Sequence, residues 1–260
     1  MARKRTERLL VTRVAGGSRR RRPDALIVEE PLTIQLDGTT VATTMRTPGH
    51  DFELAVGVCV TDGLLIGAPV TGVRYCATGS AVESAFNVVT VETGGRAPAP
   101  APRLGPTSSS CGWCGRDQLD QLLARLAPLP AVEPIDEAVL AAMPARVLDG
   151  QGLFAQTGAV HAAAAFDRDG NVLLTREDVG RHNAVDKIVG ALALEGGLPA
   201  TGRGLFVSGR ASIEMVQKAW AAGFGALVAV SAPTALAVRA ARTAGMTLVG
   251  FVRADGYNVY

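Results

Sequence analysis

Apolar and polar residues alternate with a period of two near the start of the chain, which is typical of half-buried strands. The alternation predicts strands over residues 25–28 and 32–36, and Asp37-Gly38 marks a hairpin turn before a return strand that ends at Met45. An apolar helix is expected over residues 52–60, behind a capping segment. Two more strands are expected, near residues 70–76 and 84–91.

The second half of the chain changes to short apolar runs that alternate with helical patterns. Strands are expected over residues 172–175, 205–207, 226–230 and 247–252, and helices over residues 183–194, 211–222 and 234–244. A regular order of strand and helix favours parallel strands with helices packed on their faces. The sequence therefore predicts an α/β fold with a substantially parallel sheet.

Composition shifts divide the chain into four parts. Residues 1–24 form a basic arm that we expect to be flexible, and residues 25–92 together with 145–260 form the main α/β body. The first part of that body, 25–92, is rich in predicted strands. Residues 93–115 are rich in Gly, Ala, Pro and Ser and predict a flexible connection, and residues 116–144 predict a helical segment.

Charge is distributed unevenly along the 260 residues. The whole chain carries a net charge of +2, but residues 1–22 hold nine basic residues and one acidic residue, so the remainder carries −6. The basic arm is either a solvated tail or an electrostatic guide for an anionic partner. No nucleic-acid recognition motif accompanies the charge, and no apolar run has the length of a membrane span or the pattern of a signal peptide. We therefore expect a cytoplasmic protein.

Two cysteines stand at the end of the flexible connection, in Cys111-Gly112-Trp113-Cys114-Gly115. A predicted helix start follows directly, and the N-terminus of a helix stabilises a thiolate. Four cysteines in a chain of this length fit a metal or redox role better than a disulfide framework, while Cys59 and Cys76 are expected in the core. A reactive sulfur on a mobile segment indicates sulfur-transfer chemistry.

Two predicted turns between a strand and a helix are alike, Ser208-Gly209-Arg210 and Ser231-Ala232-Pro233. Ligands of open α/β sheets bind at the carboxyl ends of strands, where helix N-termini attract anions. The side chain of Arg210 could bind a phosphate through two hydrogen bonds. Ser and Pro are also ordinary residues at a helix start, so each turn alone is a weak signal.

The segment 176–187 is unusually polar for a turn between a strand and a helix. We expect a functional site here, although a capped helix start with salt bridges would use several of the same residues. His182 could donate a hydrogen bond or act as a general acid. The cationic side chains of Arg181 and Lys187 could bind an anion. The carboxylates of Asp178 and Asp186 could accept hydrogen bonds from the amine edge of a nucleobase.

Taken together, these motifs resemble the FdhD family of formate dehydrogenase accessory sulfurtransferases. The resemblance covers nearly the whole chain and is carried by residues 29–32, 46–55, 109–115, 158–163, 176–187, 208–212, 231–234 and 258–260. It implies a homodimer with a cytidine-deaminase-like mixed sheet, flanking helices and a smaller N-terminal β-rich region.

The resemblance also implies an activity. A cysteine desulfurase would load sulfur onto Cys111 as a persulfide, and the protein would pass it to the molybdenum or tungsten of a bis-molybdopterin guanine dinucleotide (bis-MGD) cofactor. The sulfurated cofactor would then enter a formate dehydrogenase. Cys114 would assist release of the sulfur or form a disulfide with Cys111. The cofactor is bound as a substrate, and no metal site of the protein itself is implied.

A pocket for guanine nucleotides and pyrophosphates is implied at the turns. Ala254 and Asp255 depart from the Gly-Glu-like pair expected in the family, which leaves individual contacts there open. The cofactor-binding residues that we expect are Arg181, His182, Asn183, Asp186, Ser208, Arg210, Ser231, Phe251, Val252, Arg253, Ala254, Asp255 and Gly256.

Three other functions stay open at this point. His50, Cys111 and Cys114 could bind zinc, although the H-x-E and P-C-x-x-C signatures of zinc deaminases are absent. A thioredoxin-like oxidoreductase would place a strand before the CxxC, where this chain has Pro, Gly and Ser. A chaperone could bind the cofactor without sulfur transfer. His161 is open between a buried hydrogen bond and a pocket residue.

Overall fold

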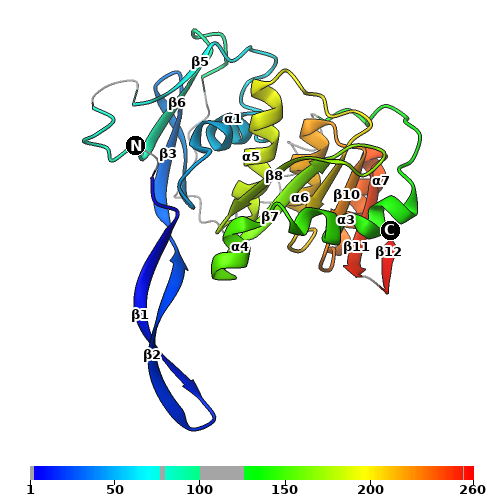
Figure 1. Cartoon of the computed structure of the whole chain (residues 1–260). Helices are drawn as coiled ribbons and strands as arrows, with labels where there is room; N and C mark the ends of the chain where they lie inside the picture. Colours follow the sequence, from blue (N-terminus) through cyan, green and yellow to red (C-terminus); the bar gives the residue numbers. More distant parts are fainter. Residues whose placement is uncertain (1–2, 77–79, 100–125, 254) are drawn as a thin grey trace.

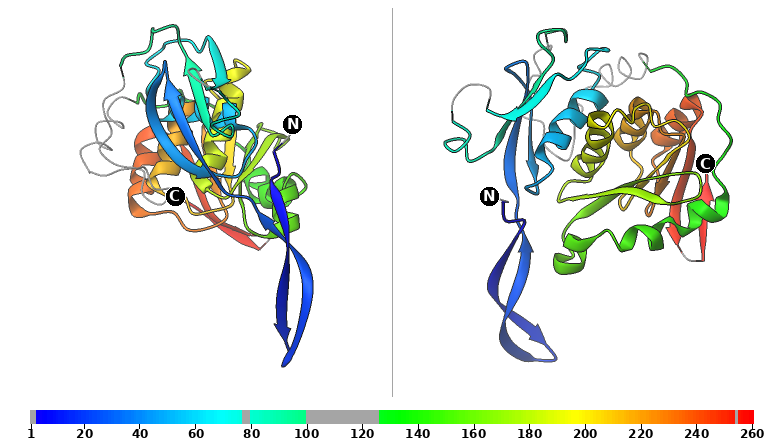
Figure 2. Two further views of the ribbon diagram at one scale, coloured as in Figure 1. Left: turned by 90° about the vertical axis from the view of Figure 1, so that its left-hand side faces the viewer. Right: turned by 45° about the horizontal axis from the view of Figure 1, so that its top comes forward.

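The computed structural model describes residues 3–76, 80–99, 126–253 and 255–260, and in these ranges the chain forms two sheets with helices and a projecting hairpin (Figure 1). The larger, six-stranded sheet has the order β12-β11-β10-β9-β7-β8, and the smaller, four-stranded sheet has the order β4-β3-β6-β5. Both views of Figure 2 show the hairpin standing away from the two sheets.

The larger sheet has three parallel strands at its centre. Strands β9, β10 and β11 are parallel, whereas β7, β8 and β12 pair antiparallel with their neighbours. The strands are β7 (His161–Phe166), β8 (Val172–Asp178), β9 (Gly204–Val207), β10 (Ala226–Ala229), β11 (Thr247–Arg253) and β12 (Gly256–Val259). The sheet is thus mixed, and the predicted parallel arrangement is confirmed for its central strands.

Helices cover both faces of the larger sheet. They are α3 (Glu137–Leu148), α4 (Gly152–Thr157), α5 (Arg181–Leu194), α6 (Ile213–Ala222) and α7 (Ala235–Ala244). Because side chains alternate along a strand, Leu205 and Val207 pack against α5, α6 and α7, while Phe206 between them packs against α3. None of the described helices is long and apolar enough to cross a membrane.

The smaller sheet packs on α1 (Asp51–Thr61). Its strands are β3 (Glu30–Leu36), β4 (Thr39–Arg46), β5 (Gly72–Tyr75) and β6 (Val88–Glu92). The predicted turn at Asp37-Gly38 joins β3 to β4, and the helix expected over residues 52–60 is α1. These two predictions are confirmed.

The N-terminal arm differs from its prediction. Residues 6–27 form an antiparallel hairpin of β1 (Thr6–Ala15) and β2 (Ser18–Ile27), so the strand expected at 25–28 is the end of a longer one. The turn uses Gly16 and Gly17, both with positive φ, which a two-residue hairpin turn requires. The sequences of the two strands do not alternate between apolar and polar residues, so the periodicity gave no sign of them. Residues 6–24 therefore form strands where we expected a flexible arm over residues 1–24.

Two further predictions need correction. The helical segment expected over 116–144 contains no helix between residues 126 and 136, and α3 begins at Glu137, where Asp136 accepts a hydrogen bond from the backbone N–H of Ala138. Helix α3 packs on the larger sheet and so belongs to the main body. Residues 100–125 lie outside the described residues.

The two sheets are joined through a close contact between α1 and α5. A Cβ atom added to Gly190 would lie 1.7 Å from the carbonyl oxygen of Glu53, and one added to Gly57 would lie 1.9 Å from that of Asp186. Both distances are far shorter than any van der Waals contact, so only glycine permits this approach of the two backbones.

We expect Gly190→Ala to separate these helices and to lower the free energy of unfolding by about 1–3 kcal/mol, the usual cost of overpacking. Gly152→Ala in α4 is the matched control, because nothing lies within 4 Å of the added Cβ atom. Urea denaturation followed by circular dichroism measures both. Equal stability of the two variants would contradict the close contact.

Candidate functional site

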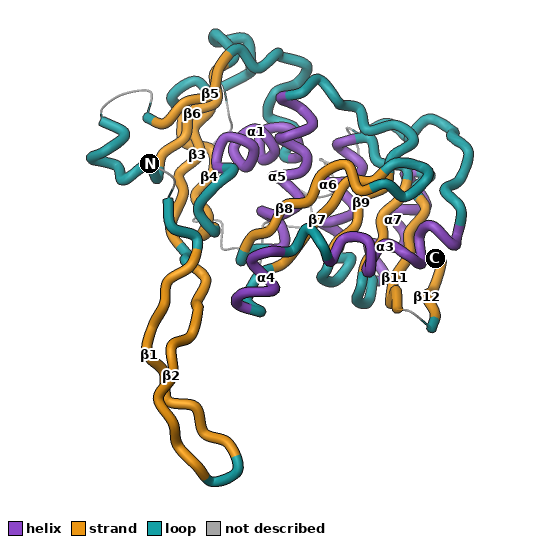
Figure 3. The backbone as a smooth tube through the Cα atoms, viewed as in Figure 1, coloured by secondary structure: helices purple, strands orange, loops and turns teal. Residues whose placement is uncertain are grey.

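The strands of the larger sheet bring several sequence-predicted residues to one edge. The parallel strands β9, β10 and β11 end there, beside β7 and β8 (Figure 3). The antiparallel pairing of β7 and β8 places His161 beside Asp178 at the same edge. Backbone hydrogen bonds join the turns, from Ser231 N to Gly209 O and from Phe251 N to Ser231 O, both 3.3 Å. The two similar turns of the sequence are therefore neighbours at the carboxyl edge of the sheet.

A cavity of about 570 Å³ opens at this edge. Its lining comes from the edge itself and from α3 and α4 opposite, and consists of Pro144, Gln151, Phe154, Gly158, Ala159, Val160, His161, Val179, Phe206, Ser208 and Val230. The volume is in the range of small-molecule sites. The mostly apolar wall holds few polar groups, among which His161 and Ser208 lie together.

His161 is half-buried in this cavity and has close polar neighbours. Its Nδ1 lies 3.4 Å from the Ser208 hydroxyl, which also accepts a hydrogen bond from the backbone N–H of Ala162 at 2.9 Å. Burial, with the nearby Arg181 guanidinium, lowers the pKa of His161, and Asp178 offsets only part of this. The imidazole is therefore neutral near pH 7 and can accept a proton. His161 therefore combines a half-buried polar contact with a place in the cavity wall.

Arg181 lies beside His161 at the first turn of α5. A Cβ atom added to Gly209 would lie 3.6 Å from both side chains, an ordinary van der Waals distance, so both side chains lie against Gly209. The Nε–H of Arg181 is buried without a hydrogen-bond partner among the described residues, and Gly180 provides no side-chain cap to α5. A helix N-terminus with a guanidinium group favours an anion.

The carboxyl group of Glu214, in the first turn of α6, lies within the influence of positively charged groups at this edge. Burial alone would raise the pKa of its carboxyl group, but hydrogen bonds and the charges of His182 and Arg181 hold the pKa below its ordinary value. The edge therefore combines a neutral imidazole with cationic groups around two helix starts.

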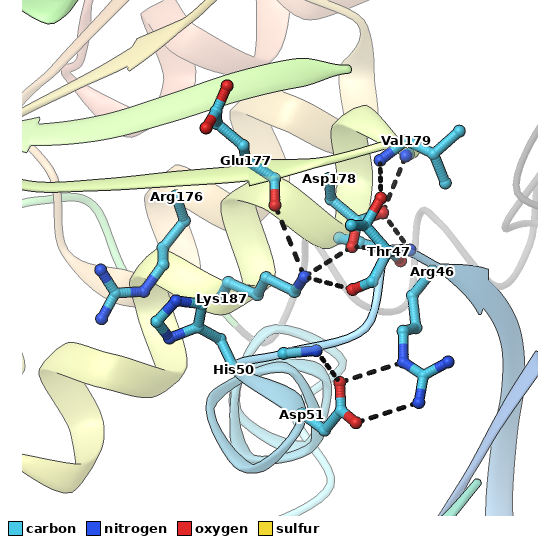
Figure 4. A network of polar contacts seen from close by, with 12 residues as sticks. Arg46, Thr47, His50, Asp51, Arg176, Glu177, Asp178, Val179 and Lys187 are labelled. Atoms are coloured by element: carbon cyan, nitrogen blue, oxygen red, sulfur yellow. Dashed lines mark hydrogen bonds and ion pairs between the residues drawn. The ribbon is translucent and has the colours of Figure 1, made fainter. Parts of the chain in front are cut away.

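Beneath the edge lies a buried polar network (Figure 4). The ammonium group of Lys187 lies 2.7 Å from a carboxylate oxygen of Asp178, and both side chains have no exposed surface. Lys187 also donates to the carbonyl oxygen of Thr47 at 2.9 Å, and the backbone N–H of Thr47 donates to Asp178 at 3.1 Å. The network ties the start of α5 to the loop before α1.

Most polar residues of the segment 176–187 have partners inside the protein, among them Glu177, which accepts hydrogen bonds from the backbone N–H groups of Leu153 and Phe154. Asn183 donates to Asp178 at 2.9 Å and to the carbonyl oxygen of Met45 at 2.8 Å. Asp186 is buried against Lys218 and Thr61, each at 2.8 Å, and burial raises its pKa to about 6. We assign Asp178, Asn183, Asp186 and Lys187 to holding α5 in place rather than to ligand contact.

His50 lies in an ion-pair cluster on the other side of this network. Its Nδ1 is 3.2 Å from Glu53, which also accepts a hydrogen bond from Arg176 at 2.8 Å. Burial opposes ionisation, but Arg176 and His50 together lower the pKa of Glu53 to about 2. No group of three or more His, Cys, Asp or Glu is placed to bind a metal in the part of the chain that the structure describes.

The remaining predicted residues lie at or near the edge, except where the structure gives no description. Arg210 is exposed, Ser231 is half-buried, and Phe251 is exposed with a positive φ of 55°. Arg253 donates to the carbonyl oxygen of Val252 at 2.9 Å, beside buried Val252. Asp255 is exposed in the turn before β12, and exposed Gly256 is the first residue of β12. Cys111, Cys114 and Ala254 lie outside the described residues.

The other two cysteines have ordinary surroundings. Cys59 is buried in the core of the smaller sheet, as expected. Cys76 is half-buried, with its sulfur 2.9 Å from the Ser84 hydroxyl, and so is not the core residue that we expected.

Known proteins similar to this chain share its full length. The profile of the FdhD/NarQ family matches residues 27–260. The sulfur carrier protein FdhD of Mycolicibacterium paratuberculosis is 46% identical over 98% of this chain and 96% of its own, and that of Streptomyces coelicolor is 47% identical over 98% and 93%. A crystal structure of a candidate formate dehydrogenase accessory protein from Desulfotalea psychrophila has a TM-score of 0.78 over 98% of this chain and 96% of that chain, at 22% identity.

The crystal structure confirms the mixed α/β fold, while the cytidine-deaminase-like arrangement stays a prediction. The profile match and the full-length identity agree with the motifs that carry the resemblance. The chain belongs to the FdhD/NarQ family.

Proposed function

We propose that this protein is a sulfurtransferase that delivers sulfur to a bis-MGD cofactor and thereby supports a formate dehydrogenase. The observation that carries the proposal is the cavity at the carboxyl edge, where His161 and Ser208 meet beside Arg181 at the start of α5. The full-length relatives named sulfur carrier proteins support the same function. The proposed partners are a cysteine desulfurase, as the sulfur donor, and a formate dehydrogenase.

The cofactor is the substrate in this proposal, and its phosphates and guanines define what the edge must bind. Arg181 and the N-terminus of α5 suit a phosphate, and exposed Arg210 suits a second anionic group. The exposed ring of Phe251 offers a flat face for a base. The side chains of Ser208 and Ser231, just after β9 and β10, are the remaining polar groups proposed to contact the cofactor.

The sulfur step follows from thiol chemistry at Cys111. Its thiolate accepts the terminal sulfur of the desulfurase persulfide, and the desulfurase leaves as a thiolate. The Cys114 thiol then attacks the Cys111 sulfur, so that a Cys111–Cys114 disulfide forms and the terminal sulfur leaves as hydrosulfide to the cofactor. A cellular dithiol reduces the disulfide afterwards. Neutral His161 is suited to take a proton during this exchange.

Binding of guanosine diphosphate tests the proposed pocket. We expect Arg210→Gln to raise the dissociation constant by about tenfold, because a charge-assisted hydrogen bond is lost. Arg239→Gln, an equally exposed change on α7, is the control and should bind as the wild type does. Isothermal titration calorimetry measures all three. The pocket assignment would be wrong if the wild type did not bind, or if both variants bound equally.

A further inference from the structure

A site that binds a guanine nucleotide needs hydrogen-bond acceptors for the edge of the base. Guanine presents two adjacent donors, the ring N1–H and the 2-amino group, and an ionised carboxylate accepts both through its two oxygens. Adenine has an acceptor nitrogen in place of the N1–H group and no 2-amino group. A carboxylate that faces the base therefore favours guanine over adenine.

Three carboxylates close to the carboxyl edge of the larger sheet have partners inside the protein. Asp178 and Asp186 form ion pairs with buried lysines, at 2.7 and 2.8 Å. Glu177 accepts hydrogen bonds from two backbone N–H groups of α4, at 2.9 and 2.7 Å. These interactions use the carboxylate oxygens that a base would need, so the acceptor for a base is expected elsewhere on the edge.

Glu214 is a further carboxylate at this edge, in the first turn of α6, and it is half-buried. Unlike Asp178 and Asp186, it forms no salt bridge within the part of the chain that the structure describes. Burial alone would raise the pKa of its carboxyl group, but hydrogen bonds and the charges of His182 and Arg181 hold that pKa below its ordinary value. The group is therefore ionised near pH 7 and can only accept hydrogen bonds.

The first turn of α6 shares this edge with the groups proposed to hold the nucleotide. Arg210 is exposed in the turn that leads into α6. Backbone hydrogen bonds of 3.3 Å join this turn, at Gly209, to the turn of Ser231, and Ser231 to Phe251. Phe251 is 45% exposed. The carboxylate of Glu214, a guanidinium group and a flat ring thus lie on neighbouring turns, and these are the groups that a purine nucleotide needs.

We propose that Glu214 contacts the base and selects guanine over adenine when this edge binds a nucleotide. The inference rests on the proposed function, because its ligand is the guanine of the bis-MGD cofactor. The two carboxylate oxygens accept the N1–H and 2-amino hydrogens, while Arg210 binds a phosphate. Since a carboxylate repels phosphates, Glu214 contributes specificity for the base rather than general affinity for nucleotides.

Isothermal titration calorimetry with guanosine, inosine and adenosine diphosphate (GDP, IDP and ADP) tests this role. IDP keeps the N1–H group and lacks the 2-amino group. The wild type should bind GDP about tenfold or more tightly than ADP, with IDP between them. In Glu214→Gln, the dissociation constant should rise about tenfold for GDP and stay equal or fall for ADP. Glu195→Gln, an exposed change at the far end of α5, is the control and should keep the wild-type preference.

A preference for GDP over ADP that is the same in Glu214→Gln as in the wild type would overturn the assignment, and a preference lost in Asp255→Asn instead would assign the base to Asp255. An equal loss of affinity for all three nucleotides in Glu214→Gln, with a lower temperature of thermal unfolding, would also overturn it, because Glu214 would then only hold α6 in place. A wild type that binds GDP and ADP equally would contradict the selectivity alone, whereas one that binds no nucleotide would contradict the proposed function as well.

Discussion

Cys111→Ala should abolish activation of a formate dehydrogenase, with a loss of about 100-fold or more. The sequence predicts a flexible connection over residues 93–115 and places Cys111 near its end, just before a predicted helix start, where a thiolate is stabilised. Alanine has no group that can accept sulfur, so nothing else in the variant replaces the carrier. The measurement is the activity of a formate dehydrogenase produced in cells that lack their own protein of this family and express the variant.

Cys76→Ala is the matched control, because it removes a thiol whose sulfur contacts Ser84 in the smaller half of the molecule. It should support wild-type activity. Full activity with Cys111→Ala would contradict sulfur transfer and favour a chaperone that only binds the cofactor. Affinity for guanosine diphosphate should be unchanged in Cys111→Ala under either function, which separates loss of sulfur transfer from loss of binding.

Lys187→Met should destabilise the protein by about 3–5 kcal/mol, the usual cost of removing one partner from a buried ion pair. The Lys187 ammonium group is fully buried against Asp178, and methionine would leave that carboxylate without its cation. Since the pair fixes the start of α5, we also expect weaker binding of guanosine diphosphate at Arg181. Thermal unfolding and calorimetry measure the two effects.

Lys4→Met serves as the control, because Lys4 is exposed on the N-terminal segment. Its free energy of unfolding should stay within about 0.5 kcal/mol of the wild type. A Lys187→Met variant as stable as this control would mean that the buried pair contributes nothing to holding α5.

Much of the fold could be predicted from the period of the apolar residues. The central strands and helices of the larger sheet could be predicted in this way. The turns that hold Arg210 and Ser231 lie at one edge because parallel strands end on the same side of a sheet. Strand β7 escaped prediction because the run of alanines after His161 has neither alternation nor β-branched residues. The arm escaped because its arginines mimic a disordered segment.

The composition of the segment 176–187 could not distinguish polar residues that bind a ligand from polar residues that hold the fold together. Its polar residues indicated a ligand site, but most of them have partners inside the protein, and Asp178 and Lys187 join α5 to the loop at Thr47. One pattern in the sequence could have distinguished the residues that pack inside the protein from those available to a ligand. Asn183, Asp186 and Gly190 recur at intervals of three and four, which places them on one face of a helix. That face packs on α1, while Arg181 at the helix start is left for the cavity.

The most direct test of sulfur transfer is the intact mass of the protein after incubation with a cysteine desulfurase, its pyridoxal phosphate and cysteine. A Cys111 persulfide predicts a gain of one sulfur atom that a thiol reductant removes. The gain should appear in the wild type and in Cys114→Ala and be absent from Cys111→Ala. No gain in the wild type would contradict sulfur transfer, and a gain lost only in Cys114→Ala would move the carrier to the second cysteine.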